Sequence, residues 1–233
     1  MTRLVGVLAL CVAVTFGAAT TGCTSTVHGA AVKSKGSVPA DDLPPLEESA
    51  LDDLLLSDND LKEISGVELE SFYTAEEMND NADVVSEADC LGAIYPGEDA
   101  YYRGSDWTAV RDELLLESSA GDDARLVEQT LVLFDTRDDA VEFFETSKEV
   151  WDTCAQTKDI TVDEGAWVPD DVQQVNGRMI SQKAEVSGTL DGICQHALGI
   201  VSNVIIEGYS CDVADNDDAQ QIATQILENA AEQ

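Results

Sequence analysis

Basic residues are scarce in this sequence. The chain of 233 residues contains 12 lysines and arginines against 47 aspartates and glutamates, which gives a formal net charge of −35 at pH 7. A field of that sign repels nucleic acid and anionic lipid headgroups, so binding to a phosphate backbone is excluded. Because the acids are spread along the whole chain, we interpret them as a solvating surface in preference to an acidic docking surface.

Histidine is nearly absent, with two residues in the chain. His28 lies in a polar segment near the N-terminus, so histidine-dependent catalysis would have to use His196. The sequence has no G-x-S-x-G elbow around a serine nucleophile, and the acidic run Asp215–Asp218 lacks the glycine and the terminal glutamate of a calcium loop. Zinc sites need clusters of histidine or free cysteine. We therefore expect no catalytic residue, no metal and no cofactor.

Long hydrophobic runs are missing after the N-terminus. The uncharged run Leu4–Ala19 follows Arg3 and is too short to span a hydrocarbon core of roughly 30 Å comfortably. We interpret residues 1–22 as a secretory signal peptide. No later segment approaches the length of a transmembrane helix.

The end of this leader resembles the lipobox of bacterial lipoproteins. Thr20-Thr21-Gly22 leads into Cys23, although a lipobox usually has a large aliphatic residue where this chain has Thr20. We expect Cys23 to be acylated and to tether the protein to the outer face of the cytoplasmic membrane. Ordinary cleavage near Ala18-Ala19, which would release a secreted protein, is the alternative.

The remaining chain divides into a spacer and one domain. Residues 23–56 are predicted to be a lipid-anchored flexible spacer, because Thr24–Pro45 is rich in Ser, Thr, Gly, Ala and Pro and has no apolar periodicity. Residues 57–233 are long enough for a single domain with a sizeable core.

Four cysteines in an exported domain imply two disulfides, with three possible connectivities. These cysteines are Cys90, Cys154, Cys194 and Cys211. The last two are equally far from Ser202-Asn203, so a hairpin with a two-residue turn there would place them opposite each other in a non-hydrogen-bonded pair, where a disulfide closes most easily. This register favours Cys194–Cys211 and, by elimination, Cys90–Cys154. A helix over Gln195–Ile200 is the competing interpretation.

The hairpin would sort its side chains onto two faces. The small or aliphatic face, suited to close approach by a helix, carries Gln195, Ala197, Gly199, Val201, Val204, Ile206, Gly208 and Ser210. The other face pairs His196 with Tyr209 and has Glu207 as a diagonal neighbour. These three residues are a candidate polar floor for a ligand cleft, and Trp107 and Trp167 are candidates for its apolar lining. The alternatives are a half-exposed sheet face and two core tryptophans.

Two further hairpins are indicated. Asn176-Gly177 between alternating runs predicts a hairpin over residues 172–183. Another pair of strands is predicted at Trp107–Glu117 and Leu126–Phe134, separated by polar residues. Three hairpins indicate a mostly antiparallel sheet.

Helical periodicity appears in three places. Apolar residues recur at three- and four-residue intervals over residues 140–154 after a capping start at Thr136, so this helix would carry Cys154 at its end. A last helix is predicted after Asp215–Asp218, and a shorter one at Ser57. Strands and helices in this order predict an α+β domain in which helices cover an antiparallel sheet.

Four stretches together resemble a known family. They are SDWTAVR at residues 105–111, WDTC at 151–154, CQHALGIVSNVIIEGYSC at 194–211 and AQQIATQI at 219–226. They resemble the PknH-like extracellular sensor domain, which occurs as the external part of a mycobacterial receptor serine/threonine kinase and as standalone actinobacterial lipoproteins. The resemblance covers roughly Ser57 to the end. It implies an α+β domain with disulfides 90/154 and 194/211 and a solvent-accessible cleft for an external ligand.

The chain departs from a receptor kinase in having no kinase domain, no G-x-G-x-x-G loop and no membrane span. We therefore expect a monomeric, non-catalytic envelope lipoprotein that binds a small ligand. The alternative is an interaction module that docks another envelope protein. The first hypothesis predicts a pocket of several hundred Å³ with convergent polar groups, and the second a flat apolar patch of several hundred Å².

Overall fold

The computed structural model describes residues 43–118, 125–157, 160–163, 165–188 and 191–231. Their strands form one antiparallel sheet with the order β1-β2-β3-β9-β8-β7-β5-β4, and β6 pairs with β7 outside this path. The strands are β1 (Leu69–Ala75), β2 (Trp107–Glu117), β3 (Leu126–Phe134), β4 (Ile160–Val162), β5 (Gly165–Pro169), β6 (Gln173–Asn176), β7 (Met179–Val186), β8 (Gly192–Val201) and β9 (Val204–Asp212).

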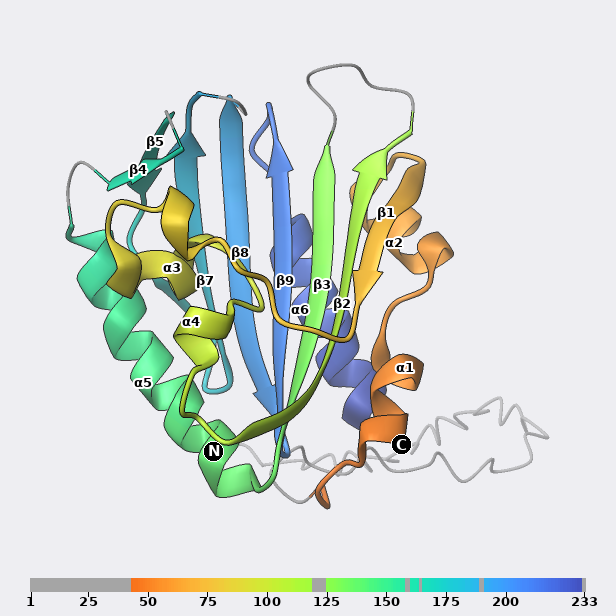
Figure 1. Ribbon diagram of the computed structural model, residues 1–233. Coiled ribbons are helices and arrows are strands. Elements are labelled where there is room, and N and C mark those ends of the chain that lie inside the picture. The colour runs from red at the N-terminus through yellow and green to blue at the C-terminus, as the bar shows by residue number, and fades with distance from the viewer. Residues whose placement is uncertain (1–42, 119–124, 158–159, 164, 189–190, 232–233) are drawn as a thin grey trace, which may run out of the picture. The chain divides into compact units, whose positions relative to one another are not determined.

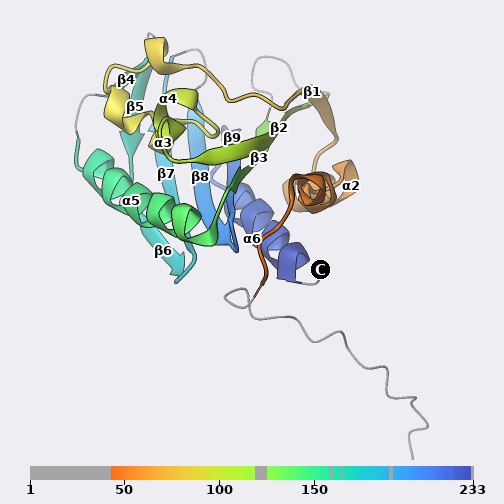
Figure 2. The ribbon, with the colours of Figure 1, turned by 60° about the horizontal axis from the view of Figure 1, so that its bottom comes forward.

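Helices cover both faces of the sheet. They are η2 (Glu48–Ala50), α1 (Leu51–Leu54), α2 (Asp58–Ser65), η3 (Ala82–Val84), η4 (Ala88–Cys90), α3 (Leu91–Ile94), α4 (Asp99–Tyr102), α5 (Arg137–Ala155) and α6 (Asp218–Ala231), where η marks a 3-10 helix. Figure 1 shows α3, α4 and α5 on one face, called here the α5 face, and Figure 2 shows α6 and α2 on the other, the α6 face. The predicted α+β class is confirmed.

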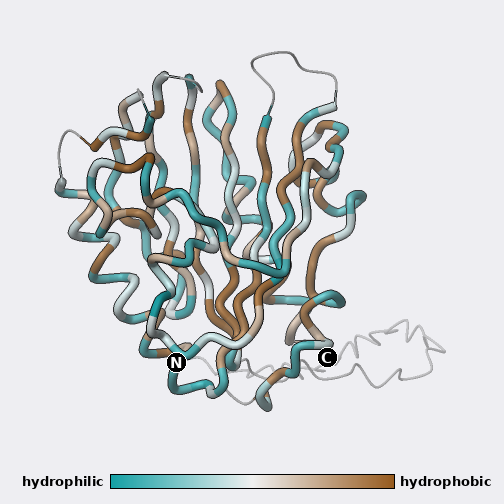
Figure 3. Tube along the Cα trace, in the orientation of Figure 1, coloured by the Kyte–Doolittle hydropathy of each residue, from teal (hydrophilic) through white to brown (hydrophobic). Residues whose placement is uncertain are grey.

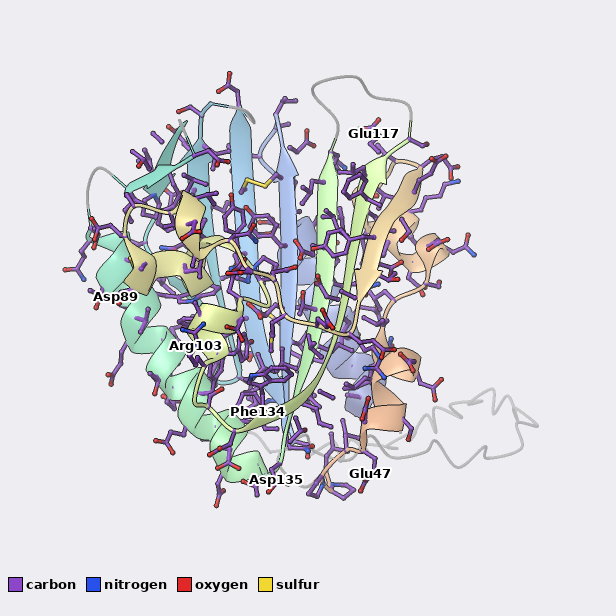
Figure 4. The ribbon with its side chains drawn as sticks, viewed as in Figure 1. Glu47, Asp89, Arg103, Glu117, Phe134 and Asp135 are labelled. Carbon is purple, nitrogen blue, oxygen red and sulfur yellow. A yellow bond between two sulfur atoms is a disulfide. The ribbon has the colours of Figure 1, made fainter. Side chains whose placement is uncertain are left out.

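Strands β8 and β9 form the expected hairpin. Cys194 pairs with Cys211 across the strands, and the disulfide between them joins Cα atoms 4.0 Å apart (Figure 4). The positive φ that such a turn requires falls on Ser202, at 50°. The helical alternative for Gln195–Ile200 is wrong, because these residues belong to a ladder with β7 on one side and β9 on the other.

The other two hairpins are confirmed as well. Strands β2 and β3 have the bounds expected from the sequence. The β6–β7 turn lies one residue later than the Asn-Gly rule predicts, since Asn176 pairs with Met179 and the turn contains Gly177 and Arg178. The side-chain oxygen of Asn176 accepts a 2.8 Å hydrogen bond from the backbone N–H of Arg178, which stabilises the turn locally.

The predicted helices are present with their caps. Thr136 and Asp139 form a reciprocal capping box at the start of α5, and Ser57 forms another at the start of α2. Near the end of α5, Cys154 forms a disulfide with Cys90, whose Cα atom lies 5.6 Å away. The second predicted disulfide is therefore also confirmed, and it ties α5 to η4.

The small residues of the β8–β9 hairpin allow α6 to lie close to the sheet. A Cβ atom on Gly208 would lie 2.3 Å from the carbonyl oxygen of Ala219, and one on Gly199 would lie 3.4 Å from Cδ1 of Leu227. The expected stripe of α6 is buried against this face: Ile222, Ala223, Ile226, Leu227 and Ala230. Figure 3 shows hydrophobic residues concentrated in the central strands.

The packed chain begins before the expected boundary at Ser57. Several leucines of residues 43–56 are buried in the core of the α6 face: Leu43, Leu51, Leu54 and Leu56. Both the backbone N–H and the carbonyl of Leu46 bind the side-chain amide of Asn203. Residues 43–56 therefore form part of the folded domain and not of a spacer. The leader, Cys23 and the rest of the predicted spacer lie outside the described residues.

Candidate functional site

Residues 76–106 cross the α5 face between β1 and β2 and carry η3, η4, α3 and α4; we call them the cover segment. Figure 1 shows this segment in front of β8 and β9. Its path needs a glycine at Gly97, where φ is +63° and a Cβ atom would lie 3.1 Å from Cγ2 of Thr130. The cover segment therefore approaches the sheet closely at this point.

Glu207 is the main polar attachment of the cover segment. Its Oε1 atom accepts a 2.7 Å hydrogen bond from the hydroxyl of Tyr102 and a 3.0 Å bond from the backbone N–H of Gly97. Its Oε2 atom lies 2.9 Å from Nε2 of His196, and Nδ1 of the same ring lies 3.3 Å from the carbonyl oxygen of Ala93. Glu207 and His196 together bind three points of the cover segment.

These contacts correct both interpretations of the polar face of the hairpin. His196 is 2 % exposed, Glu207 0 % and Tyr209 6 %, so the three residues form neither an open polar floor nor a half-exposed sheet face. They are on one face as expected, but the cover segment shields them from solvent. His196 also packs against the buried ring of Trp151, with ring centroids 4.6 Å apart.

A second buried cluster attaches the cover segment nearer to the β1 edge. Nδ2 of Asn79 lies 3.3 Å from Oδ2 of Asp112 and 3.2 Å from Oε1 of Glu128, and the hydroxyl of Tyr73 donates to Asn79 and to Glu128. Thr130 donates a 2.5 Å hydrogen bond to the other oxygen of Asp112. Burial, followed by the charge of Asp112, raises the pKa of Glu128 well above its usual range.

Asp112 and Glu128 both lie within reach of Nδ2 of Asn79, and two carboxyl groups this close to each other in a buried site resist ionising together. Burial also raises the pKa of Asp112 and that of Glu98, which binds the backbone and the side chain of Asn81. The structure thus places four buried carboxyl groups on one side of the sheet, where their side-chain partners are amides, hydroxyls and a histidine. In the described part of the chain, no three His, Cys, Asp or Glu side chains are arranged to hold a metal ion.

A pocket of about 240 Å³ opens beside this cluster, at the end of the hairpin that carries the disulfide. We call it the disulfide pocket. Residues on or next to six strands and at the end of α3 line it: Ile94, Tyr95, Leu126, Val162, Asp163, Ala166, Trp167, Val186, Ser187, Cys194, Tyr209 and Cys211. Cys194, Cys211 and Tyr209 also form a small buried cluster of their own with Leu126 and Val186. The pocket is therefore mainly apolar, with a few polar atoms at defined places.

Two phenol groups supply polar atoms to the disulfide pocket. The rings of Tyr95 and Tyr209 are inclined by 57°, with centroids 6.4 Å apart, and their hydroxyls have no hydrogen-bond partner among the described residues. Burial, with Asp163 and two buried glutamates as secondary causes, raises the pKa of Tyr95 to about 12. Both phenols are therefore neutral at physiological pH and are free to bind a ligand.

A wider groove of about 630 Å³ runs along α5, beside the Cys90–Cys154 disulfide. Charged and small residues line most of it, including Glu87, Asp89 and Glu149. This groove contains none of the side chains of the buried polar cluster. The disulfide pocket is the better candidate site, because its wall is mainly apolar and two phenol groups from different parts of the fold converge on it.

The structure brings some of the predicted site residues together and separates others. Tyr209 lines the disulfide pocket, and His196 stacks behind it at 5.6 Å, edge to face. Trp167 is buried and lines the pocket, whereas Trp107 lies at the start of β2, pairs with Phe134 and is not part of the lining.

Sequence analysis missed several residues of this region. Tyr95 and Glu98 lie in the irregular cover segment, whose position no local pattern predicts. Asp112 and Glu128 lie among other polar residues of their strands, and their inward direction follows only once the registers of β2 with β3 and of β3 with β9 are known. An acid at such a position indicates a buried polar cluster.

Comparisons with known proteins agree with this fold. Residues 46–229 match the PknH-like extracellular domain. The serine/threonine-protein kinase PknH of Mycobacterium bovis is 30 % identical over 190 residues, as is that of Mycobacterium tuberculosis H37Rv. Each alignment covers 79 % of this chain but only 31 % and 30 % of those kinases, so the chain spans about a third of their length.

A solved structure shows the same architecture. The crystal structure of the extracellular domain of PknH from Mycobacterium tuberculosis superposes with a TM-score of 0.72 and 28 % sequence identity, covering 80 % of this chain and 97 % of that one. In the part of this chain that the structure describes, no helix is long and apolar enough to cross a membrane. Together, these matches show that the chain belongs to the PknH-like extracellular domain family.

Proposed function

We propose that this extracytoplasmic, sensor-type domain is a non-catalytic lipoprotein of the cell envelope that binds a small ligand in the disulfide pocket. The single observation that carries the proposal is the Tyr209 hydroxyl. The residue is 6 % exposed, yet its hydroxyl has no partner among the described residues and borders the pocket. The hydroxyl is not among the buried atoms without a partner, so it is open to the pocket and can bind a ligand in exchange for water.

The position of Tyr95 supports a sensing role. Tyr95 belongs to the cover segment, which is attached to the sheet through Glu207, whereas Tyr209 belongs to the sheet itself. A ligand between the two phenols would therefore contact both parts. If the cover segment moved away from the sheet, this ligand would lose its contact with Tyr95. The ligand would therefore bind the attached position of the segment more tightly than a displaced one, and a ligand-driven conformational change requires such a difference in affinity.

The alternative function, docking of an envelope protein through an apolar patch, has less support. The large hydrophobic residues that are exposed in the described part of the chain are Phe72, Val141, Val168 and Val213. They lie on β1, α5, β5 and the residues after β9, respectively. Four single residues on separate elements do not make a patch of several hundred Å².

Native mass spectrometry of the full chain isolated from its own envelope tests ligand binding. We expect a bound small molecule on the wild type that is lost in Ala166→Trp, because Ala166 is exposed at the rim and a larger side chain there fills the pocket. The matched control is Val168→Trp, which places the same side chain at an exposed site on the same strand outside the lining. A small molecule retained by Ala166→Trp, or a protein partner in its place, would overturn the proposal.

The lipid anchor is a separate part of the proposal and rests on the resemblance of residues 20–23 to a lipobox. We expect Cys23 to incorporate labelled palmitate in the producing cell and the protein to fractionate with membranes. The Cys23→Ala variant should lose the label and leave the membrane fraction. Unlabelled wild-type protein in the culture medium would show that it is secreted.

A further inference from the structure

The disulfide pocket has a negative electrostatic potential. Among the residues that the structure describes, its lining includes the carboxylate of Asp163 and no lysine, arginine or histidine. The pKa of Tyr95 is raised by burial first and then by the charge of Asp163, so the field of the Asp163 carboxylate reaches the hydroxyl inside the pocket. Electrostatic interactions of this kind are stronger in a partly enclosed apolar site than in water.

Two basic residues on or next to the strands that line the pocket are bound to acids away from it. Arg125 precedes the lining residue Leu126, but its guanidinium binds Asp212 and the carbonyl of Ser65. Lys183 binds Asp215 and Asp217. The overall charge of −35 adds a long-range bias of the same sign. An anionic ligand would therefore enter the pocket against the local field and the overall field of the protein.

Three aromatic side chains form walls of the same pocket. Tyr95 and Tyr209 are inclined to each other, and Trp167 joins the lining from β5. Faces of such rings attract cations, most strongly when the cation is desolvated and when the ring is tryptophan. An inorganic cation such as Ca²⁺ needs six to eight oxygen ligands, which this mainly apolar lining does not offer.

We propose that the ligand of the disulfide pocket is a small organic cation, an inference that rests on the proposed binding function. Its ammonium group would lie between the aromatic rings and the carboxylate of Asp163. Its apolar part would pack against the disulfide. The volume of about 240 Å³ equals that of roughly eight water molecules. It accommodates a compact alkylammonium compound and not a long chain.

Three probes with one shape separate the effect of charge from that of size. Choline, 3,3-dimethylbutan-1-ol and 3,3-dimethylbutanoate share a branched head on a short chain and are cationic, neutral and anionic, respectively. We expect saturable binding of choline to the full chain, about tenfold tighter than that of the alcohol, and no binding of the carboxylate. The measurement is a titration followed by calorimetry, with NMR shifts of the Trp167 indole reporting the location.

Two charge-neutralising variants make the test specific. Asp163→Asn should weaken choline binding several-fold and leave the binding of the alcohol unchanged, because only the cation uses the carboxylate. Asp152→Asn removes the same charge from an exposed position on α5 and should change neither. Both positions are exposed, so both variants are expected to fold.

The outcomes distinguish this inference from the proposed function. Equal binding of choline and the alcohol in the pocket, or tighter binding of the carboxylate, would overturn the cation inference and leave small-molecule binding intact. Binding of no probe would also overturn it, while the native mass spectrum would still decide whether a small molecule occupies the pocket. Choline binding that Asp152→Asn weakens as much as Asp163→Asn would show a general charge effect and reject the site.

Discussion

The hydroxyl of Tyr102 donates a 2.7 Å hydrogen bond to Oε1 of Glu207, and both residues are completely buried. The two residues are separated by 105 positions in the chain, one in α4 of the cover segment and the other in β9. This contact and those of Gly97 and His196 make Glu207 the residue on which attachment of the cover segment to the sheet depends.

We expect Glu207→Ala to lower the free energy of unfolding by about 3–5 kcal/mol, because it leaves buried donors without an acceptor. Tyr102→Phe removes one of these hydrogen bonds and keeps the ring, so it should cost about 1–3 kcal/mol. Urea denaturation of the oxidised protein measures both. A loss for Glu207→Ala no greater than that for Tyr102→Phe would contradict the central role of the carboxylate.

The Asp112–Glu128 pair predicts that stability falls as the pH rises. Burial raises the pKa values of both groups, so between the unfolded value of about 4 and the folded one the native protein holds a proton that the unfolded chain has lost. The free energy of unfolding therefore decreases as the pH rises through this window. Thermal unfolding should show higher stability at pH 5 than at pH 8.

Glu128→Gln tests the origin of that pH dependence. The amide is neutral at every pH, so the difference in stability between pH 5 and pH 8 should shrink by about 1 kcal/mol or more. Glu63→Gln is the control, since it removes an exposed charge from α2. If both variants retained the dependence of the wild type, general charge repulsion would explain it instead.

Close packing of α6 against β9 predicts the effect of a single methyl group. A Cβ atom at Gly208 would meet the backbone oxygen of Ala219 at 2.3 Å, so Gly208→Ala must displace the helix and should destabilise the protein by about 2 kcal/mol or more. Gly177→Ala adds the same group where no atom lies within 4 Å and should be nearly neutral. Equal melting temperatures for the two variants would show that α6 does not pack as described.

We expect the side chain of Asn203 to hold residues 43–56 against the folded domain. Its side chain binds the backbone of Leu46 and the carbonyl of Phe134, so Asn203→Ala is expected to cost about 2–4 kcal/mol and to speed amide hydrogen exchange at Leu46. Asn59→Ala changes an exposed residue of α2 and should leave that exchange rate alone. Rapid exchange at Leu46 already in the wild type would place the segment in the spacer after all.

Much of the fold follows from patterns within short stretches of the sequence. The symmetry of Cys194 and Cys211 about Ser202-Asn203 determines a register, and the register determines which side chains share a face. Capping residues at Thr136 and Ser57 set the starts of α5 and α2. These features were predictable because turns, caps and strand alternation depend on neighbours in the chain.

Only part of the candidate site could be predicted from the sequence. His196, Glu207 and Tyr209 share a face because of the β8–β9 register, but their burial depends on the cover segment, which has little regular structure. Its partners on the sheet are up to 110 positions away in the chain. No local rule relates Gly97 to Glu207, or Tyr95 to Tyr209.

The sequence by itself determined the six strands of the three hairpins, the main helices, the pairing of the cysteines and the faces of the β8–β9 hairpin, because each depends on residues that are close in the chain or opposite in a ladder. Only the tertiary structure decided that residues 43–56 belong to the core and that a polar sheet face is covered. It also placed Tyr95, Trp167 and Tyr209 around one pocket. These arrangements arise when distant segments exclude water together, so their energy exists only in the assembled fold.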